Sequence, residues 1–484
     1  MAVNQRFPLF FITITILLVL VTGCGGGGSL SFPPPQGGFT NASLSGPFAF
    51  SYTGSDATGF ITVAGSFQAD GAGHITSGMQ DLRNATSVAT NVSTTGTYTV
   101  RADGRGSATL NSSAGNSTID FVLVASGHGF VTRFDSNATG SGTLDQQTTS
   151  AFSNTALAGQ FAFSLAGIDS VGNPLGVAGI FTSDNAGNIT GIDDSNDSGS
   201  VITNDPLTGT IPVASSGRGT ATINTVRGTS TFAFYVVDTT HLKLVEIDSS
   251  LALAGDAFRQ TGPFSNASVS GPFAFTLAGA DNLSVAPFAT GGVLTSDGAG
   301  TITSGTQDFN DGGSLTTNVG LTGSYSIAAN GRGTLSIVTT AGTFTFTIYP
   351  SSGGVLVLET DIAFLTTGTA LSQSPPFTAG SFNGTYGMNF TGVTPNGGLD
   401  SIAQFTADGA SKFTGIIDVN NAGGVTFGQP LSATFNVASS GRSVVTLQTP
   451  LGTQNMVFYA VSGTRAVFIE LDTSVVAIGE IKHQ

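Results

Sequence analysis

Short runs of alternating apolar and polar residues recur along the whole chain. In one of them, Phe344, Phe346 and Ile348 alternate with threonines, which places the apolar side chains on one face of a strand. The same alternation begins at Phe161 and at Phe273. No stretch shows a sustained helical period with capping residues. The pattern therefore predicts an all-β protein.

Three sequence marks recur along the chain with one shared period of about 110 residues. A glycine followed two residues later by an aromatic residue recurs at Gly46, Gly159, Gly271 and Gly384. A Gly-Arg pair recurs with its arginine at Arg105, Arg218, Arg332 and Arg442. An aspartate near the end of each repeat recurs at Asp135, Asp248, Asp361 and Asp472. These marks predict four tandem units of ordinary domain size, at residues 39–151, 152–263, 264–376 and 377–484.

Each unit reads as a meander of short antiparallel strands. The third unit holds about eight strand candidates, separated by hairpin signals such as Asp297-Gly298 and Asn330-Gly331. Eight strands joined by tight turns suffice to close a small up-and-down β-barrel without free edges. The alternative is an immunoglobulin-like β-sandwich, which needs long connections across the sheets.

The predicted unit resembles the barrels of lipocalins and avidin, including the aromatic residue that follows a glycine in the first strand. The resemblance implies architecture only. The chain has no tryptophan, so it lacks the Gly-x-Trp mark of lipocalins, and no lipocalin ligand residue is carried over. The phenylalanines of the alternating strands are expected to fill the barrel interiors, because an eight-stranded barrel is just wide enough for its own side chains.

An apolar segment at residues 7–21 follows Arg6 near the start of the chain. It is shorter than the roughly 20 apolar residues that a transmembrane helix needs. Val21, Gly23 and Cys24 occupy the positions of the apolar, small and lipidated residues in the lipobox of bacterial lipoproteins. The run from Val21 to Cys24 therefore resembles a lipoprotein signal.

This resemblance implies a signal peptide at residues 1–23 and a lipid on Cys24. Such a lipid would anchor the protein in the cell envelope, at the outer membrane or the cell surface. Residues 24–38 are rich first in glycine and then in proline, and they are predicted to form a tether. The whole chain also resembles multi-repeat lipoproteins found in bacterial genomes, which implies a location and no activity.

The charge content narrows the classes of partner. Charged residues make up 9% of the chain, whereas about 25% is usual. The net charge is −15, with only 14 lysines and arginines, which argues against nucleic acid or an anionic membrane surface as a partner. Cys24 is the only cysteine, so no disulfide framework is expected and stability must come from packing.

The arginines of the Gly-Arg pairs are the most conspicuous recurring charges. Recurring glutamates, two positions before the late aspartate, are Glu246, Glu359 and Glu470. We expect each arginine to face a glutamate of its own unit in a structural ion pair that fixes strand register, with a polar ligand site as the alternative. The first unit has Arg133 in place of the glutamate, so Arg105 is expected to pair with Asp135 or to lie exposed.

Metal binding and catalysis find little support in the sequence. Asp-rich turns at Asp70, Asp184 and Asp297, and the runs that start at Asp193 and Asp308, suggest calcium as an alternative. Neither group has the spacing of an EF-hand loop, and Asp-Gly is in any case the usual hairpin pair. The histidines have no recurring partner, and no Gly-x-Ser-x-Gly or His-Glu-x-x-His motif occurs. We predict no cofactor, no metal and no enzymatic activity.

The sequence thus predicts a lipid-anchored envelope protein that displays four non-catalytic β-units for surface binding, adhesion or structural spacing. The alternative is a lipocalin-like carrier of small apolar or sugar-like ligands. A hydrolase is a third hypothesis, which would need clustered acids or a serine–histidine contact. Large cavities would favour carriage, and filled interiors would favour adhesion or a structural role.

Overall fold

The computed structural model describes residues 38–125, 127–248 and 251–484. The range Pro35–Gln484 forms one compact unit. The predicted signal peptide, Cys24 and the tether up to residue 37 lie outside the described residues. No helix in the described part is long and apolar enough to cross a membrane.

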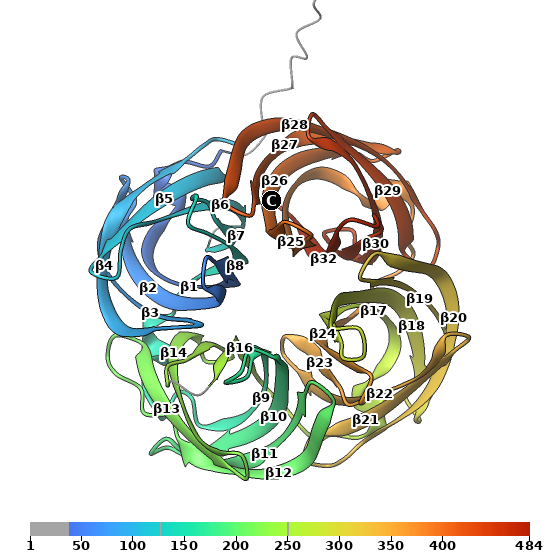
Figure 1. Cartoon of the computed structure of the whole chain (residues 1–484), viewed down its shortest axis with the longest axis horizontal. Coiled ribbons are helices and arrows are strands. Elements are labelled where there is room, and N and C mark those ends of the chain that lie inside the picture. Colours follow the sequence, from blue (N-terminus) through green and yellow to red (C-terminus); the bar gives the residue numbers. More distant parts are fainter. Residues whose placement is uncertain (1–37, 126, 249–250) are drawn as a thin grey trace, which may run out of the picture. The chain divides into compact units, whose positions relative to one another are not determined.

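Four closed eight-stranded antiparallel barrels follow one another along the chain, as predicted (Figure 1). Barrel 1 consists of β1 (Ser45–Asp56), β2 (Gly59–Asp70), β3 (His74–Asn84), β4 (Val88–Val100), β5 (Arg105–Ser112), β6 (Ser117–Ala125), β7 (His128–Arg133) and β8 (Ala138–Gln146). Barrel 2 consists of β9 (Gly159–Ile168), β10 (Pro174–Ser183), β11 (Asn188–Asp197), β12 (Ser200–Thr210), β13 (Arg218–Thr225), β14 (Gly228–Asp238), β15 (His241–Glu246) and β16 (Ala252–Arg259). Barrel 3 consists of β17 (Ser270–Asp281), β18 (Ala286–Asp297), β19 (Thr301–Asp311), β20 (Ser314–Ile327), β21 (Gly333–Thr339), β22 (Gly342–Ser351), β23 (Gly354–Glu359) and β24 (Phe364–Ser372). Barrel 4 consists of β25 (Asn383–Thr394), β26 (Gly397–Asp408), β27 (Lys412–Asn421), β28 (Gly424–Val437), β29 (Arg442–Thr449), β30 (Gly452–Ser462), β31 (Arg465–Glu470) and β32 (Val476–His483).

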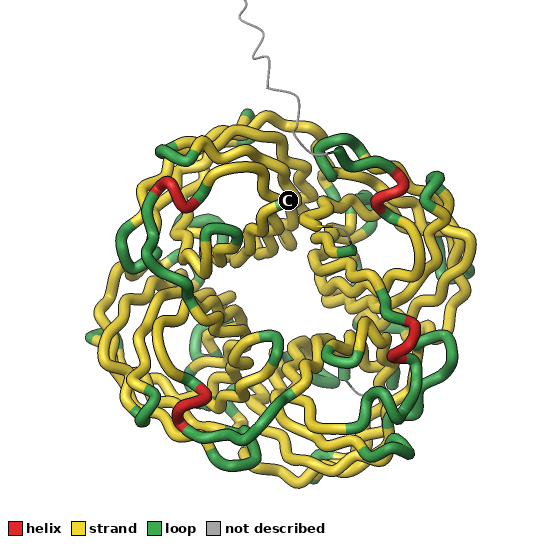
Figure 2. Tube along the Cα trace, turned by 180° about the vertical axis from the view of Figure 1, so that it is seen from behind, coloured by secondary structure: helices red, strands yellow, loops and turns green. Residues whose placement is uncertain are grey.

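Each barrel is a simple meander in which every strand pairs with the next and the first strand pairs with the last. This closure rules out the immunoglobulin-like alternative, because no strand crosses between two sheets. The described helices are short 3-10 turns, one ahead of the first strand of each barrel (red in Figure 2). They are η1 (Asn41–Ser43), η2 (Thr149–Ala151), η3 (Asn266–Ser268) and η4 (Ala379–Ser381).

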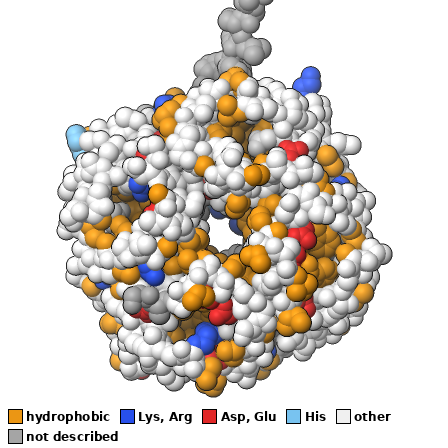
Figure 3. Space-filling model, in the orientation of Figure 1, with side chains coloured by type: hydrophobic (Ala, Val, Ile, Leu, Met, Phe, Trp, Pro, Cys, Tyr) orange, Lys and Arg blue, Asp and Glu red, His pale blue; other side chains and the backbone are white. Residues whose placement is uncertain are grey.

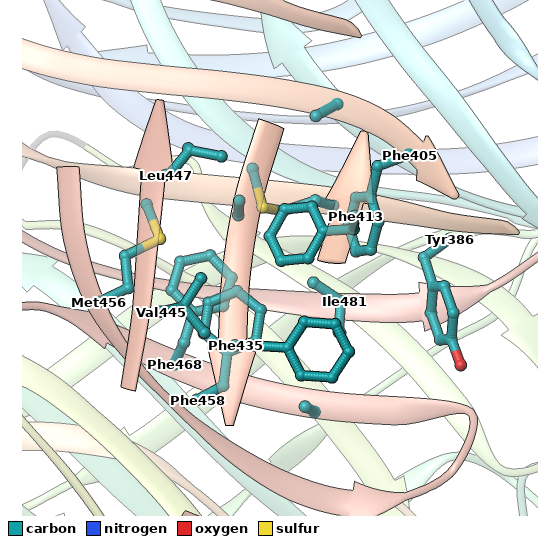
Figure 4. Packing of buried hydrophobic residues seen from close by; sticks show 14 of the residues in the cluster. Tyr386, Phe405, Phe413, Phe435, Val445, Leu447, Met456, Phe458, Phe468 and Ile481 are labelled. Atoms are coloured by element: carbon teal, nitrogen blue, oxygen red, sulfur yellow. The ribbon is translucent and has the colours of Figure 1, made fainter. Parts of the chain in front are cut away.

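Each barrel interior is packed with its own aromatic and aliphatic side chains. In barrel 4, the rings of Phe405 and Phe413 are 4.5 Å apart, and those of Phe458 and Phe468 are 4.6 Å apart (Figure 4). Full burial of each such side chain stabilises the fold by about 1.5–3 kcal/mol. A pocket beside Phe405, Phe413 and Phe458 has a volume of only about 20 Å³, room for about one water molecule. The expectation that phenylalanines form the cores is therefore confirmed.

Smaller apolar clusters join each barrel to two others. Each cluster has members from both barrels: Ala64 and Tyr235 for barrels 1 and 2, Ile180 and Tyr349 for barrels 2 and 3, Val293 and Tyr459 for barrels 3 and 4, and Val122 and Ile402 for barrels 4 and 1. The contacts therefore close into a cycle, in which the first barrel touches the last as well as the second. Charged side chains are sparse on the face shown in Figure 3, as the composition requires.

Candidate functional site

The four arginines of the Gly-Arg pairs lie at the boundaries between barrels. Each stands at or just before the fifth strand of its barrel and binds an aspartate on the third strand of the preceding barrel. The pairs are Arg218–Asp81 (2.7 Å), Arg332–Asp194 (2.6 Å), Arg442–Asp308 (2.6 Å) and Arg105–Asp418 (2.9 Å). The last pair joins barrel 1 to barrel 4, so each of the four boundaries of the cycle carries an Arg–Asp ion pair at the equivalent position.

The boundary between barrels 2 and 3 shows the geometry in full. Arg332 donates from Nε and Nη2 to the two carboxylate oxygens of Asp194, at 2.8 and 2.6 Å. The backbone N–H of Asn204 donates to Asp194 Oδ1 at 2.7 Å, and the Tyr349 hydroxyl donates to Oδ2. The Asp194 side chain is fully buried, whereas that of Arg332 is 16% exposed. A buried carboxylate with a bidentate arginine and two further donors is well compensated for its loss of hydration.

Local backbone structure in the barrel wall places this aspartate. Asn204 follows Asp194 by ten residues and has a φ of +59°, which turns its N–H toward the carboxylate beside a register shift between β11 and β12. Asparagine and glycine tolerate this left-handed conformation better than other residues. The same ten-residue spacing recurs, with the donors Asn91, Asn318 and Gly428.

The boundary between barrels 4 and 1 departs from the other three. The tyrosine that donates to the aspartate at the other boundaries is replaced by Val122, which lies opposite Arg105 in the β5–β6 pair. Val122 packs against Ile402 of barrel 4. Arg105 makes a second ion pair with Asp103, at 2.9 Å, and is only 4% exposed. The carboxylate of Asp103, which belongs to the same barrel, therefore compensates part of the buried charge of Arg105.

The predicted pairing of these arginines with Glu246, Glu359 and Glu470 is wrong. In the described part of the chain, no ion pair joins these two sets of residues. The reason is strand alternation: Glu246 shares the inward face of β15 with core residues Leu242 and Leu244, whereas Arg218 reaches outward to the neighbouring barrel. Glu359 and Glu470 end β23 and β31 in the same way.

The expectation for Arg105 in the first unit is also wrong, because Arg105 is buried and bound to Asp418. It is Arg133 that binds Asp135, at 2.5 Å, and Arg133 also donates to the Tyr52 hydroxyl at 2.9 Å.

The three glutamates are buried acids with few partners. Burial raises the pKa of Glu246 and of Glu359 to about 8, and that of Glu470 to about 10. The Thr366 hydroxyl lies 2.6 Å from Glu359 Oε2. These side chains are therefore protonated at neutral pH. The late aspartates bind strand backbone: Asp248 and Asp361 accept the N–H groups of Thr231 and Thr345 at 2.8 and 2.7 Å.

An asparagine two residues after the boundary aspartate forms a second recurring link, which the sequence analysis missed. Asn196 donates from its amide nitrogen to the carbonyls of Glu359, Asp361 and Phe364 in barrel 3, at 2.9–3.1 Å. Asn310 and Asn420 make the equivalent contacts from barrels 3 and 4. In barrel 1 the position is occupied by Arg83, which donates to the carbonyl of Leu251 in barrel 2. The recurring Asp-x-Asn could have revealed this link. Two of its three copies fall in the runs that suggested calcium.

The aspartates of the hairpin turns bind the backbone of their own turns. Asp297 Oδ1 accepts the N–H groups of Ala299, Gly300 and Thr301, at 2.7–2.9 Å, and these bonds lower its pKa to about 2. Asp70 and Asp184 make similar bonds. Among the described residues, no group of three or more acidic or histidine side chains is placed to hold a metal ion.

A second charged network links barrels 4, 1 and 2. The Lys243 side chain is fully buried, and its Nζ lies 2.8 Å from Asp145 of barrel 1 and 3.8 Å from Asp256. Burial lowers the pKa of Lys243, but the two carboxylates outweigh it and the net shift is upward. His128 contacts Asp145 through Nδ1 and accepts from Lys482 of barrel 4 through Nε2, at 2.9 Å. Two of the three lysines of the chain thus join barrels.

Barrels 2 and 4 have an open mouth at one end. The mouth of barrel 4 holds a cavity of about 710 Å³, lined by neutral residues such as Ile417, Val419 and Leu451 with Asp472 at the rim. The mouth of barrel 2 holds a cavity of about 570 Å³ with several charged residues. In barrel 3 the same end is filled by the packed rings of Phe288, Phe309, Phe344 and Phe364.

No protein-family model matches the sequence, and no curated protein matches it. Among solved structures, a point mutant of the vaccine antigen transferrin binding protein B (TbpB) from Haemophilus parasuis Hp5 aligns with a TM-score of 0.20. The identity is 11%, over 76% of this chain and 85% of that chain. Intact Ap-TbpB, with N and C lobes, aligns with a TM-score of 0.17 and 10% identity, over 75% and 86% of the two chains. TM-scores this low carry no argument about function.

Proposed function

We propose that the protein is a non-catalytic binding and scaffold protein of the cell envelope, held there by a lipid on Cys24. The observation that supports this role is the recurrence of a buried Arg–Asp pair at all four barrel boundaries. Removing one partner of such a pair leaves a buried charge, so each boundary resists separation. The four units would then present their loops as one body at the membrane surface.

Carriage of small ligands is the second candidate function, and the open mouths of barrels 2 and 4 favour it. Their cavities, of about 570 and 710 Å³, fall in the usual range for small-molecule sites, about 300–1,000 Å³. The two functions are compatible, since a cyclic body can hold ligand sites at the ends of its barrels.

The anchor is tested by the Cys24→Ala variant of the full chain, expressed in the source cell with a labelled fatty acid. We expect the wild-type protein to carry the label and to sediment with membranes, and the variant to lose both properties. Ser29→Ala, in the predicted tether, is the matched control and should behave as the wild type. A variant that keeps its label would contradict the proposed anchor.

A further inference from the structure

The cavity in the mouth of barrel 2 is lined by both apolar and charged side chains. Phe163, Leu165 and Leu175 line the cavity, and their side chains belong to the core of the barrel. Val171 and Val226, which adjoin the lining residues Ser170 and Arg227 in the sequence, are 78% and 74% exposed. Exposed valines beside such a cavity extend the surface that the apolar part of a ligand can cover.

Small residues keep this mouth open. Ser195 directly follows Asp194 in barrel 2, and Phe309 occupies the equivalent position after Asp308 in barrel 3. Ser230 lies opposite Ile223, as Phe344 lies opposite Ile337. Two of the four phenylalanines that fill barrel 3 are therefore serines in barrel 2, and the space that their rings would occupy is left free.

The charges of this mouth are also peculiar to barrel 2. Arg227 Nη2 lies 2.6 Å from Asp193 Oδ2. The other oxygen, Oδ1, has no hydrogen-bond partner among the described residues, although the side chain is only 2% exposed. The positions of Asp193 and Arg227 are occupied by Gln307 and Ala341 in barrel 3, and by Ile417 and Leu451 in barrel 4.

Two further carboxylates give the mouth an excess of negative charge. Asp169 and Asp197 line the same cavity. Burial raises the pKa of Asp197, the nearby charge of Asp169 raises it further, and Arg227 offsets part of this shift. Together with Asp193, the cavity is lined by three carboxylates and by one guanidinium, that of Arg227. Such a mouth attracts cations and repels anions.

We propose that the mouth of barrel 2 binds a small organic cation, a protonated amine on an apolar body. The apolar body would occupy the cavity, and the ammonium group would lie beside the carboxylates of Asp169, Asp193 and Asp197 that line it. This inference rests on the ligand-binding part of the proposed function and is independent of the lipid anchor. Barrel 4, whose open mouth lacks both Asp193 and Arg227, would not share the preference for cations.

The test uses the full chain as purified, and the heat of titrating each probe into protein-free solution is subtracted. The probes are hexylammonium, hexan-1-ol and hexanoate, which have the same chain and different head groups, titrated by calorimetry. We expect hexylammonium to bind at least ten times more tightly than hexan-1-ol, and hexanoate to bind most weakly. Ser230→Phe should abolish the hexylammonium site by filling the mouth.

Asp193→Asn gives a sharper result, because it frees Arg227 from its partner. The variant should bind hexylammonium more weakly and hexanoate more tightly than the wild type does, so that the preference for the cation shrinks. Asp311→Asn, at the position in barrel 3 that corresponds to Asp197, is the control and should change nothing, and circular dichroism checks that each variant folds. Equal binding of the three probes would overturn the cation preference but leave ligand carriage standing. Binding of none would overturn both, while the anchored scaffold is tested separately at Cys24.

Discussion

Arg332→Ala should destabilise the boundary between barrels 2 and 3 by about 3 kcal/mol. Removing one partner of a buried ion pair typically costs 3–5 kcal/mol. We expect the lower end of this range, because Asp194 keeps the donors Tyr349 and Asn204. Arg332→Lys should destabilise the protein less than Arg332→Ala does, because lysine keeps the positive charge. It should still be less stable than the wild type, because lysine cannot form the bidentate contact.

Equilibrium urea unfolding followed by circular dichroism measures this effect as a change in the free energy of unfolding. Arg101→Ala is the control, because Arg101 is exposed, and it should change stability by less than about 0.5 kcal/mol. If Arg332→Ala were no more destabilising than Arg101→Ala, the boundary ion pairs would not stabilise the assembly and the reasoning would fail.

Two further perturbations test a buried glutamate of barrel 3 and a buried lysine that joins barrels 1 and 2. Burial raises the pKa of Glu359 from its ordinary 4.5 to about 8, so the folded protein holds a proton there that the unfolded chain releases. Stability should therefore fall as pH rises from about 4.5 to 8, by up to about 1.4 kcal/mol per pH unit for this group. Glu359→Gln should flatten that dependence in unfolding experiments at pH 5 and 7, and an unchanged slope would contradict the shift. Lys243→Met leaves Asp145 and Asp256 without their buried cation and should cost about 3 kcal/mol in urea unfolding. The matched Lys412→Met, at an exposed lysine, should cost almost nothing, and equal effects would refute the role of the network.

The fold of each unit could be predicted from the sequence because its determinants are local. Alternation at Phe344 and Phe346 placed both rings on the inner face of β22, and both lie in the core of barrel 3. Asp297-Gly298 ends β18 at a tight turn into β19, as its hairpin signal indicates. Local alternation and turn chemistry together specify a meander, and eight strands suffice to close it.

The contacts between barrels could not be predicted in the same way. The period revealed Arg332, but its partner Asp194 lies 138 residues away in a different barrel, and no local pattern encodes that distance. One sequence pattern did indicate a contact between barrels. Residues 232–237 are apolar without alternation, and this stretch of β14 is buried on both faces. An uninterrupted apolar run in an antiparallel strand indicates cover on its outer side.

A double-mutant cycle on Arg105 and Asp418 tests whether the barrels contact one another in a closed cycle. These residues lie 313 positions apart and meet only if barrel 1 touches barrel 4. Arg105→Ala, Asp418→Asn and the double variant should give a coupling energy of about 1–3 kcal/mol in urea unfolding. Arg105→Ala combined with Asp308→Asn, at a different boundary, should be additive. Additive effects for Arg105 and Asp418 as well would contradict the closed cycle.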